Sequence, residues 1–276
     1  TTTTTTMTPA PSFPNAAWRL MRSLRDATRH RRLSPPVGGE RFPLPPTLEP
    51  LGSERGQQLF AEARVNSQLV ESLLRQDHPA FCAVASAMTV ALSEQVGPSD
   101  QRRFMDVFQE APSWPPVLSH YGCGALDGLP GPVKYHLLRH LQYDGSPMSL
   151  LAEWFRAQGL DAEAVSAGDV DADTFRSDVL AAFPKGDGPR RCYVVANYSR
   201  AAVGQRMFSG GHYAPIGGFH EASDKVLLLE VNSWRYPSVW VDLLLLWGAI
   251  HTRVGNGTWR GYLRVASDRK LTDDAA

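Results

Sequence analysis

The sequence contains few cysteines, and their number and spacing argue against two common kinds of structural site. The cysteines are Cys82, Cys123 and Cys192, an odd number, and no two of them form a CxxC pair. This pattern argues against a disulfide framework and against a structural zinc site. Because free thiols suit a reducing compartment, we expect a cytoplasmic protein.

The sequence also lacks an excess of either charge and a long hydrophobic run. Lys plus Arg and Asp plus Glu each total 28, so there is no global basic field of the kind that attracts nucleic acid. The longest apolar run, Val241 to Ile250, is too short to span a bilayer and contains Asp242. We therefore expect neither a nucleic-acid partner nor a transmembrane segment.

The rest of the composition is that of an ordinary globular protein with a distinct N-terminal part. Of the 276 residues, 43% are hydrophobic and 20% are charged, values that suit one folded domain. Residues 1–50 begin with a threonine run, continue through a basic stretch without a following apolar segment, and end in a proline-rich run. We expect this extension to be disordered or partly helical and not to act as a secretory signal. The folded domain is expected at 51–268, with a tail at 269–276.

Hydrophobic periodicity places helices first and strands later. Apolar residues at helical spacing predict helices over 54–77, 82–97, 100–109, 132–142 and 149–158. Short β-branched and aromatic runs predict strands over 192–198, 212–220, 225–232 and 259–266, and a helix is predicted between two of them, at 239–250. Helices followed by such strands indicate an α+β domain with an antiparallel sheet.

Two other patterns match known ligand sites poorly. Glycines at 122, 124, 128 and 131 fit neither a Walker A loop nor a GxGxxG turn after a strand. His136 and His140 share a predicted helix face, but Arg139 lies between them and no acidic third ligand stands at the spacing of a zinc-binding helix. We interpret the pair as a solvated helix face and expect neither a metal nor a cofactor.

Cys82 is placed to act as a nucleophile because it lies in the first turn of a predicted helix. Unpaired N–H groups and the helix dipole favour a thiolate at this position. The alternative is a small buried cysteine without chemistry, as most free cysteines are. A base for the thiol is offered by His212, which follows the flexible pair Gly210-Gly211 and stands 130 residues after Cys82. Papain-like enzymes use the same order of residues and a comparable separation.

The remaining parts of such a site also have candidates. Glu230 and Asn232 are two residues apart on one predicted strand, and either side chain could hold the tautomer of the imidazole. Gln76 stands six residues before Cys82 and could donate a hydrogen bond to an oxyanion. The sequence leaves the choice between Glu230 and Asn232 open.

Two blocks of this sequence resemble the phytochelatin synthase family. Residues 76–86, QDHPAFCAVAS, are similar to the family segment Gln-x-x-x-Ala-Tyr-Cys-Gly-(Leu/Val)-Ala-Ser. Residues 210–240 resemble the family's histidine strand and the strand after it, whose Tyr-Pro-x-x-Trp ending is kept as Tyr236, Pro237 and Trp240. Weaker similarity runs through 197–200, 204–205 and 260–262, so that the resemblance covers about residues 50 to 267.

The resemblance implies a papain-like fold, in which an N-terminal helical lobe with the nucleophile helix packs on a C-terminal antiparallel sheet. It implies that Cys82 attacks glutathione, releases glycine and holds a γ-glutamylcysteinyl group, which a second glutathione or water then accepts. His212 would be the base, Gln76 the oxyanion donor and Glu230 the match to the family's triad aspartate. Arg260 matches an arginine that holds the acyl donor, and we expect Arg235, Tyr236 and Gly211 to line the same substrate site. The product phytochelatin would connect the protein with the response to metal ions.

Two departures from the family pattern bear on the substrate. Glu230 is longer than the family aspartate, and Ser233 replaces a family arginine, with Arg235 in the position of a family lysine. The Cys-rich C-terminal part of the plant members has no counterpart in this sequence, as in the bacterial short forms. An alternative function is therefore an amide-forming acyltransferase that uses another acyl donor, such as a carrier-protein thioester. A non-catalytic relative that binds a ligand or partner is the alternative from a different class, and a homodimer is compatible with each.

Overall fold

An antiparallel sheet of eight strands lies at the centre of the described chain. The computed structural model describes residues 41–77, 81–104, 146–185, 190–208, 210–255 and 257–268. Seven strands follow the order β1-β7-β6-β5-β4-β8-β3, and β2 pairs with β5 beside this path. The strands are β1 (Glu49–Pro50), β2 (Arg64–Val65), β3 (Asp161–Ser166), β4 (Arg191–Ser199), β5 (Gly211–His220), β6 (Lys225–Leu228), β7 (Val239–Asp242) and β8 (Gly261–Ser267).

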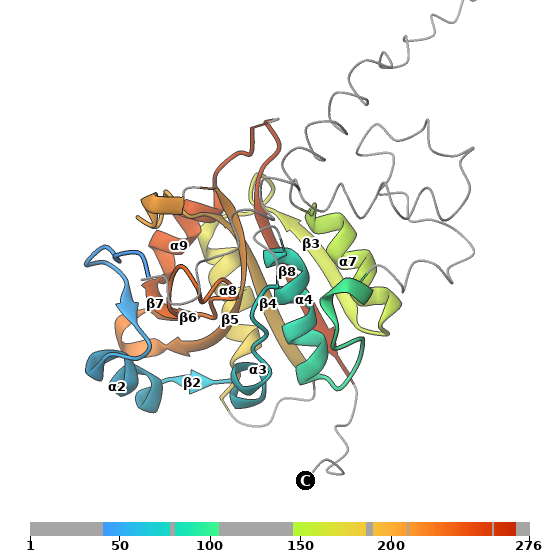
Figure 1. Cartoon of the computed structure of the whole chain (residues 1–276), viewed down its shortest axis with the longest axis horizontal. Coiled ribbons are helices and arrows are strands. Elements are labelled where there is room, and N and C mark those ends of the chain that lie inside the picture. Colours follow the sequence, from blue (N-terminus) through green and yellow to red (C-terminus); the bar gives the residue numbers. More distant parts are fainter. Residues whose placement is uncertain are drawn as a thin grey trace, which may run out of the picture.

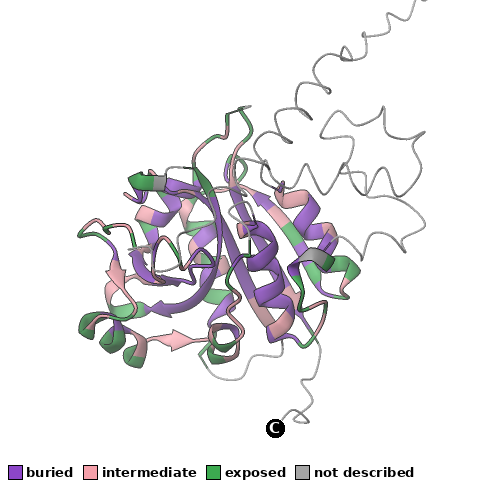
Figure 2. Ribbon diagram, viewed as in Figure 1, coloured by how far each residue is buried: buried purple, intermediate pink, exposed green. Residues whose placement is uncertain are grey.

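Helices cover both faces of this sheet (Figure 1). One face packs against α2 (Glu54–Glu62), α3 (Ser67–Glu71), α4 (Cys82–Ser93) and α7 (Met148–Ala157), and the other against α8 (Ala172–Ala182) and α9 (Leu243–Ile250). Short 3-10 helices lie at η1 (Gln101–Arg103), η5 (Arg206–Phe208) and η6 (Glu221–Ser223). The two-sided cover explains the near-continuous apolar run of β4, because Tyr193 and Val195 face one core and Val194 and Ala196 face the other. Figure 2 shows this strand and its neighbours buried along most of their length.

The prediction of an α+β domain with an antiparallel sheet is confirmed, since every strand pairing among the described residues is antiparallel. The strands expected at 192–198, 212–220 and 259–266 are present with bounds that differ by at most two residues. The strand expected at 225–232 ends at Leu228, so Glu230 lies beyond it. The sequence interpretation missed β3 and α8.

Two predicted helices are wrong because part of each forms a strand of the sheet. The stretch 54–77 is interrupted where Arg64 and Val65 pair with β5, and the Asn66 side chain then caps α3 by accepting from Leu69 N–H at 2.9 Å. The stretch 239–250 begins as β7, and α9 starts only after Asp242, whose carboxylate accepts from the N–H groups of the next helix turn. Pairing with a distant strand therefore overrides local helix propensity in both places.

Several other predictions fall outside the described residues. Of the helix expected at 100–109, only the first part is described, and it is the short helix η1. The helix expected at 132–142, the glycines at 122–131, Cys123, and the pair His136 and His140 all lie outside.

Residues 41–50, which we assigned to the N-terminal extension, pack against the sheet. Pro50 and Glu49 form β1 and pair with β7, and Leu48 is buried in the core. Phe42 N–H donates to the Arg235 carbonyl at 2.8 Å. Residues 41–50 therefore contribute to the described fold, although we placed them in the extension.

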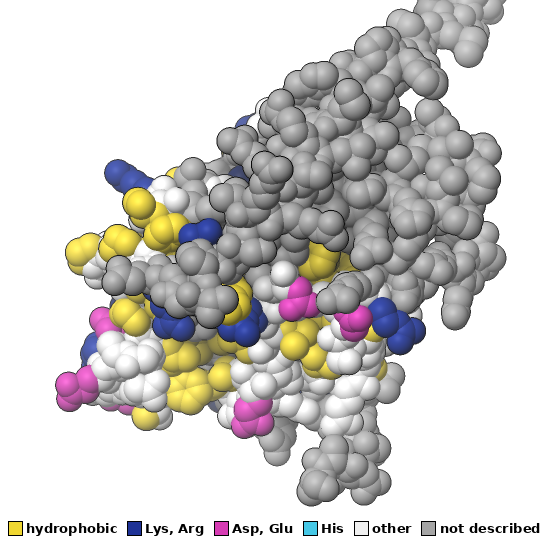
Figure 3. All heavy atoms as spheres, in the orientation of Figure 1, with side chains coloured by type: hydrophobic (Ala, Val, Ile, Leu, Met, Phe, Trp, Pro, Cys, Tyr) yellow, Lys and Arg dark blue, Asp and Glu magenta, His cyan; other side chains and the backbone are white. Residues whose placement is uncertain are grey.

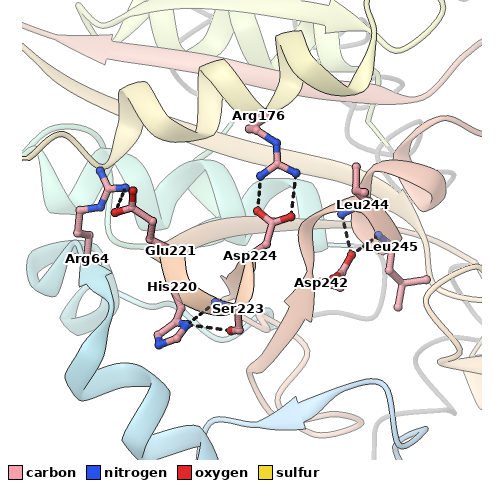
Figure 4. A network of polar contacts seen from close by, with 9 residues as sticks. All are labelled: Arg64, Arg176, His220, Glu221, Ser223, Asp224, Asp242, Leu244 and Leu245. Carbon is pink, nitrogen blue, oxygen red and sulfur yellow. Dashed lines mark hydrogen bonds and ion pairs between the residues drawn. The ribbon is translucent and has the colours of Figure 1, made fainter.

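Polar contacts fix the turn at the end of β5 (Figure 4). Arg176 on α8 binds both carboxylate oxygens of Asp224, and Arg64 on β2 binds Glu221 at 3.3 Å. The Asp224 carbonyl also accepts from Leu243 N–H at the start of α9. These contacts anchor the strand that carries His212 near its other end.

Basic and acidic side chains both lie on the visible described surface, in small groups among apolar ones (Figure 3). None of the helices in the described segments combines the length and apolarity that crossing a bilayer requires.

Candidate active site

The thiol of Cys82 lies at the first residue of α4, a twelve-residue helix buried along almost its whole length. Phe81 is the N-cap residue and provides no side-chain hydrogen bond to the helix. The N–H groups of the first turn, which carries Cys82, are therefore not capped by its side chain. Cys82 is partly exposed, whereas the next residues of the helix are buried. Cys82 therefore lies where the buried helix begins, at the edge of the core.

His212 supplies a hydrogen bond to this thiol from strand β5. The imidazole is buried, with 2% of the residue exposed, and its ring meets the Tyr198 ring edge-on at 5.7 Å between centroids. Burial alone would raise the pKa of Cys82, but the hydrogen bond and charge of His212, the Tyr213 N–H and the charge of Arg200 together lower it. The site thus favours a thiolate next to an imidazolium.

Glu230 is the acceptor that the structure places on the imidazole. Its Oε1 atom lies 2.7 Å from His212 Nε2 and accepts from Arg200 Nη2 at 2.9 Å and from Asn232 N–H at 2.7 Å. Burial would raise the pKa of Glu230, yet His212 and Arg200 lower it to about 2. Of the two candidates that the sequence left open, Asn232 contacts this carboxylate through its backbone and Glu230 contacts the imidazole.

This arrangement leaves the second imidazole nitrogen for the thiol. Because Nε2 is bonded to Glu230, Nδ1 is the nitrogen that can exchange a proton with Cys82. Burial and the charge of Arg200 act to lower the pKa of His212, while Glu230 and Cys82 raise it, and the pKa lies above its ordinary value. The three residues can therefore carry out nucleophilic acyl transfer.

Arg200 is a part of the site that the sequence analysis did not assign. It follows β4 directly, none of its side chain is exposed, and its Nη1 donates to Gln205 Oε1 at 2.5 Å. Its guanidinium lies 5.1 Å from the centre of the Tyr236 ring. A charged residue at the end of an apolar strand was the available signal, but an arginine there is usually exposed.

Arg260 and Gly211 come together, as the expected substrate site requires. A Cβ atom at Gly211 would overlap Arg260 Nη1, so only glycine leaves room for the guanidinium there. None of the described carboxylates forms an ion pair with Arg260, whose pKa is lowered by burial while Tyr213 and Cys82 raise it. The guanidinium of Arg260 therefore lies against the residue that directly precedes His212.

The other predicted residues have different surroundings. Gln76 is buried, and its N–H donates to the Val231 carbonyl at 2.9 Å, beside Glu230 in sequence. The guanidinium of Arg235 lies over the Phe42 ring at 5.0 Å. Tyr236 is fully buried, and its ring contacts both the Phe42 ring and the Arg200 guanidinium. It therefore packs against Arg200 and does not line an open substrate surface.

Comparison with known proteins identifies the family. The family model described as phytochelatin synthase matches residues 40–262. The chain is 28% identical over 232 residues to glutathione gamma-glutamylcysteinyltransferase 1 of Lotus japonicus, a match that covers 82% of this chain and 41% of the relative. It is 25% identical over 222 residues to glutathione gamma-glutamylcysteinyltransferase of Schizosaccharomyces pombe, covering 77% of this chain and 46% of the relative. With glutathione gamma-glutamylcysteinyltransferase 1 of Arabidopsis thaliana it shares 24% identity over 232 residues, or 82% of this chain and 43% of the relative.

The chain spans less than half the length of these relatives. The family match nevertheless covers most of the chain and includes Cys82, His212 and Glu230. The chain therefore belongs to the phytochelatin synthase family, which is a family of enzymes.

Proposed function

We propose that this protein transfers a γ-glutamylcysteinyl group from glutathione through a thioester on Cys82. The observation that supports this most directly is the hydrogen-bonded set of Cys82, His212 and Glu230, in a chain that matches a family of glutathione-dependent transferases. We further propose that the domain has the papain-like arrangement of the family and that it acts in the reducing cytoplasm, where its nucleophile stays a free thiol.

In the first step the Cys82 thiolate attacks the carbonyl carbon of the Cys–Gly peptide bond of glutathione. The carbonyl oxygen becomes an oxyanion, and we assign its stabilisation to Gln76 and the N–H groups at the start of α4. The protonated His212 then gives its Nδ1 proton to the leaving amine, so that the C–N bond breaks and glycine departs. The thioester that remains carries γ-glutamylcysteine.

In the second step neutral His212 takes a proton from the acceptor. The acceptor is either the amino group of a second glutathione, which yields phytochelatin, or water, which yields γ-glutamylcysteine. Attack on the thioester carbonyl breaks the C–S bond and returns the Cys82 thiolate. Glu230 keeps the Nε2–H of the imidazole oriented in both steps.

Arg260 is our candidate for binding the acyl donor. It lies beside Gly211, near Cys82, without a carboxylate partner among the described residues, and an arginine in such a site can bind a substrate carboxylate in two-point fashion. Arg235 offers a second cation at the same end of the sheet, where it lies on Phe42.

The experiment that tests this function is intact-protein mass spectrometry after incubation with glutathione, with free glycine followed in parallel. We expect a γ-glutamylcysteinyl adduct or glycine release that is lost in Cys82→Ala and retained in Cys192→Ala. The absence of both, from a protein whose Cys82 still alkylates rapidly, would redirect the proposal to another acyl donor such as a carrier-protein thioester. An alkylation rate no faster than that of a free thiol would instead support a non-catalytic relative.

A further inference from the structure

A chain of hydrogen bonds leads away from Arg260 through two buried side chains. Arg260 Nη1 donates to Asn197 Oδ1 at 3.3 Å, and Asn197 Nδ2 donates to the Tyr213 hydroxyl at 3.1 Å. The Tyr213 hydroxyl donates in turn to the Ser146 carbonyl at 2.7 Å. Tyr213 and Asn197 face each other across β4 and β5, with 5% and 9% of their surfaces exposed.

The direction of this chain is fixed at both of its ends. The Ser146 carbonyl can only accept, and the Tyr213 hydroxyl donates its proton to it. The hydroxyl oxygen accepts from the amide nitrogen of Asn197, which turns the amide oxygen toward Arg260. Since a guanidinium can only donate, this is the one amide orientation that satisfies every member.

Arg260 is consequently restrained by one hydrogen bond and by close packing. Asn197 Oδ1 accepts from Nη1, and Nη1 occupies the space that a Cβ atom at Gly211 would fill. An arginine oriented in advance loses less side-chain freedom when a ligand binds, and the binding free energy improves accordingly. The same restraint keeps the guanidinium at one place relative to Cys82.

We propose that Tyr213 is a positioning residue that, through Asn197, orients Arg260 to receive a carboxylate of the acyl donor. This inference rests on the proposed function only in the identity of the donor. Without the Tyr213 hydroxyl, the NH2 group of the buried Asn197 amide loses its acceptor, and only Arg260 still binds this side chain. The amide is then restrained from one side only, so Asn197 and the guanidinium that it binds can adopt other rotamers.

The test uses Tyr213→Phe, Arg260→Met and the double variant in the full chain. The matched control is Tyr193→Phe. Tyr193 lies on β4 of the same sheet, and its buried hydroxyl binds Glu94 and not Asn197. The first readout is alkylation of Cys82 by iodoacetate, an anion, and by iodoacetamide, its neutral counterpart. Both reagents react with the thiolate, so the iodoacetamide rate measures how reactive the thiolate is. The ratio of the iodoacetate rate to the iodoacetamide rate measures the attraction of an anion by the cation near the thiol.

We expect Tyr213→Phe to lower the iodoacetate-to-iodoacetamide ratio several-fold, up to about tenfold, the size expected for one hydrogen bond between neutral groups. The iodoacetamide rate should stay near wild type, and Tyr213→Phe should add nothing in the Arg260→Met background. With glutathione, the KM for glycine release should rise by a similar factor while kcat changes little. Tyr193→Phe should leave both the ratio and the KM unchanged.

Two results would overturn the inference. In one, Tyr213→Phe slows both alkylating reagents equally, so the hydroxyl acts on the thiol or on the fold. In the other, the effects of Tyr213→Phe and Arg260→Met on the ratio add, so the hydroxyl does not act through the arginine. If the wild type releases no glycine from glutathione, the proposed function fails, but the alkylation ratios still decide the role of Tyr213.

Discussion

His212 Nε2 lies 2.7 Å from Glu230 Oε1, and that single oxygen also accepts hydrogen bonds from Arg200 and from the Asn232 N–H. Three donors on one buried oxygen hold the longer glutamate side chain in one place. The arrangement also assigns the two imidazole nitrogens, since Nε2 faces the carboxylate and Nδ1 is left for the thiol. We expect both catalysis and stability to depend on this oxygen and its surroundings.

Replacement of Glu230 by Gln should abolish most of the activity. A neutral amide stabilises the imidazolium poorly and can favour the wrong tautomer, so we expect a loss in kcat/KM on the order of 10²–10⁴-fold. Glu230→Asp keeps the charge but ends about 1.5 Å short of one or more donors, so its loss should be intermediate. Glu62→Gln is the control, because Glu62 also contacts a histidine, His220, at 3.2 Å and lies outside the proposed site. A fully active Glu230→Gln enzyme would contradict the role of the carboxylate.

The thiol of Cys82 should titrate below the ordinary range of a cysteine. His212, the Tyr213 N–H and Arg200 lower its pKa against the effect of burial, so the rate of iodoacetamide alkylation should reach its plateau at a lower pH than for free cysteine. In His212→Ala the rise should move to higher pH. Cys192 serves as an internal reference, since burial raises the pKa of its thiol. A profile for Cys82 that follows Cys192 would rule out an activated thiol.

Gly211 and Gly210 form a matched pair for testing the space around Arg260. A Cβ at Gly211 would overlap Arg260 Nη1, whereas a Cβ at Gly210 would meet nothing within 4 Å. Because the obstructing atom is the end of a flexible side chain, Gly211→Ala should fold but displace the guanidinium. We expect the KM for glutathione to rise about tenfold or more in Gly211→Ala, the loss of one hydrogen bond to a charged group, and to stay unchanged in Gly210→Ala. Equal KM values for the two variants would place Arg260 outside the binding site.

Removal of the Arg200 charge should destabilise the fold. Arg200→Met leaves Glu230 buried without its arginine, and breaking such a buried pair costs about 3–5 kcal/mol in the free energy of unfolding. Lysine cannot reach Gln205 and Glu230 together in the same geometry, so Arg200→Lys should recover only part of the loss. Urea unfolding measures the effect, with Arg264→Met as the control because this arginine also pairs with two carboxylates but about half of its side chain is exposed. Arg264→Met should cost at most about 1 kcal/mol.

Glu230 should also make the stability depend on pH in the acid range. Its pKa falls from an ordinary 4.5 to about 2 in the folded state, so its contribution is fully present above about pH 4.5 and is lost as the pH falls toward 2. The urea midpoint of the wild type should therefore fall more steeply over this window than that of Glu230→Gln. Parallel pH dependences of the two proteins would show that the carboxylate is not held ionised.

The elements that carry the proposed nucleophile and the proposed base could be predicted from the sequence because their signals are local. Cys82 opens an apolar helix after a proline, and His212 opens a strand after two glycines, and both elements form where the pattern indicates. The order of helices and strands likewise follows from hydrophobic periodicity. The helices expected over 54–77 and 239–250 were wrong because each contains a short segment that pairs with a strand far away in the chain.

The sequence by itself determined the chemistry that the chain can attempt, through a thiol, an imidazole and the residues around them. Only the tertiary structure decided which groups meet. Glu230 and Asn232 are two residues apart and equally suited to bind the imidazole, and the choice depends on the turn after β6, which directs the carboxylate to His212 and the Asn232 N–H to the carboxylate. The burial of Arg200 depends on Gln205 and Tyr236, and the orientation of Arg260 depends on Asn197 and Tyr213. Hydrogen-bond geometry and burial arise from packing between distant segments, so no local pattern in the sequence can specify them.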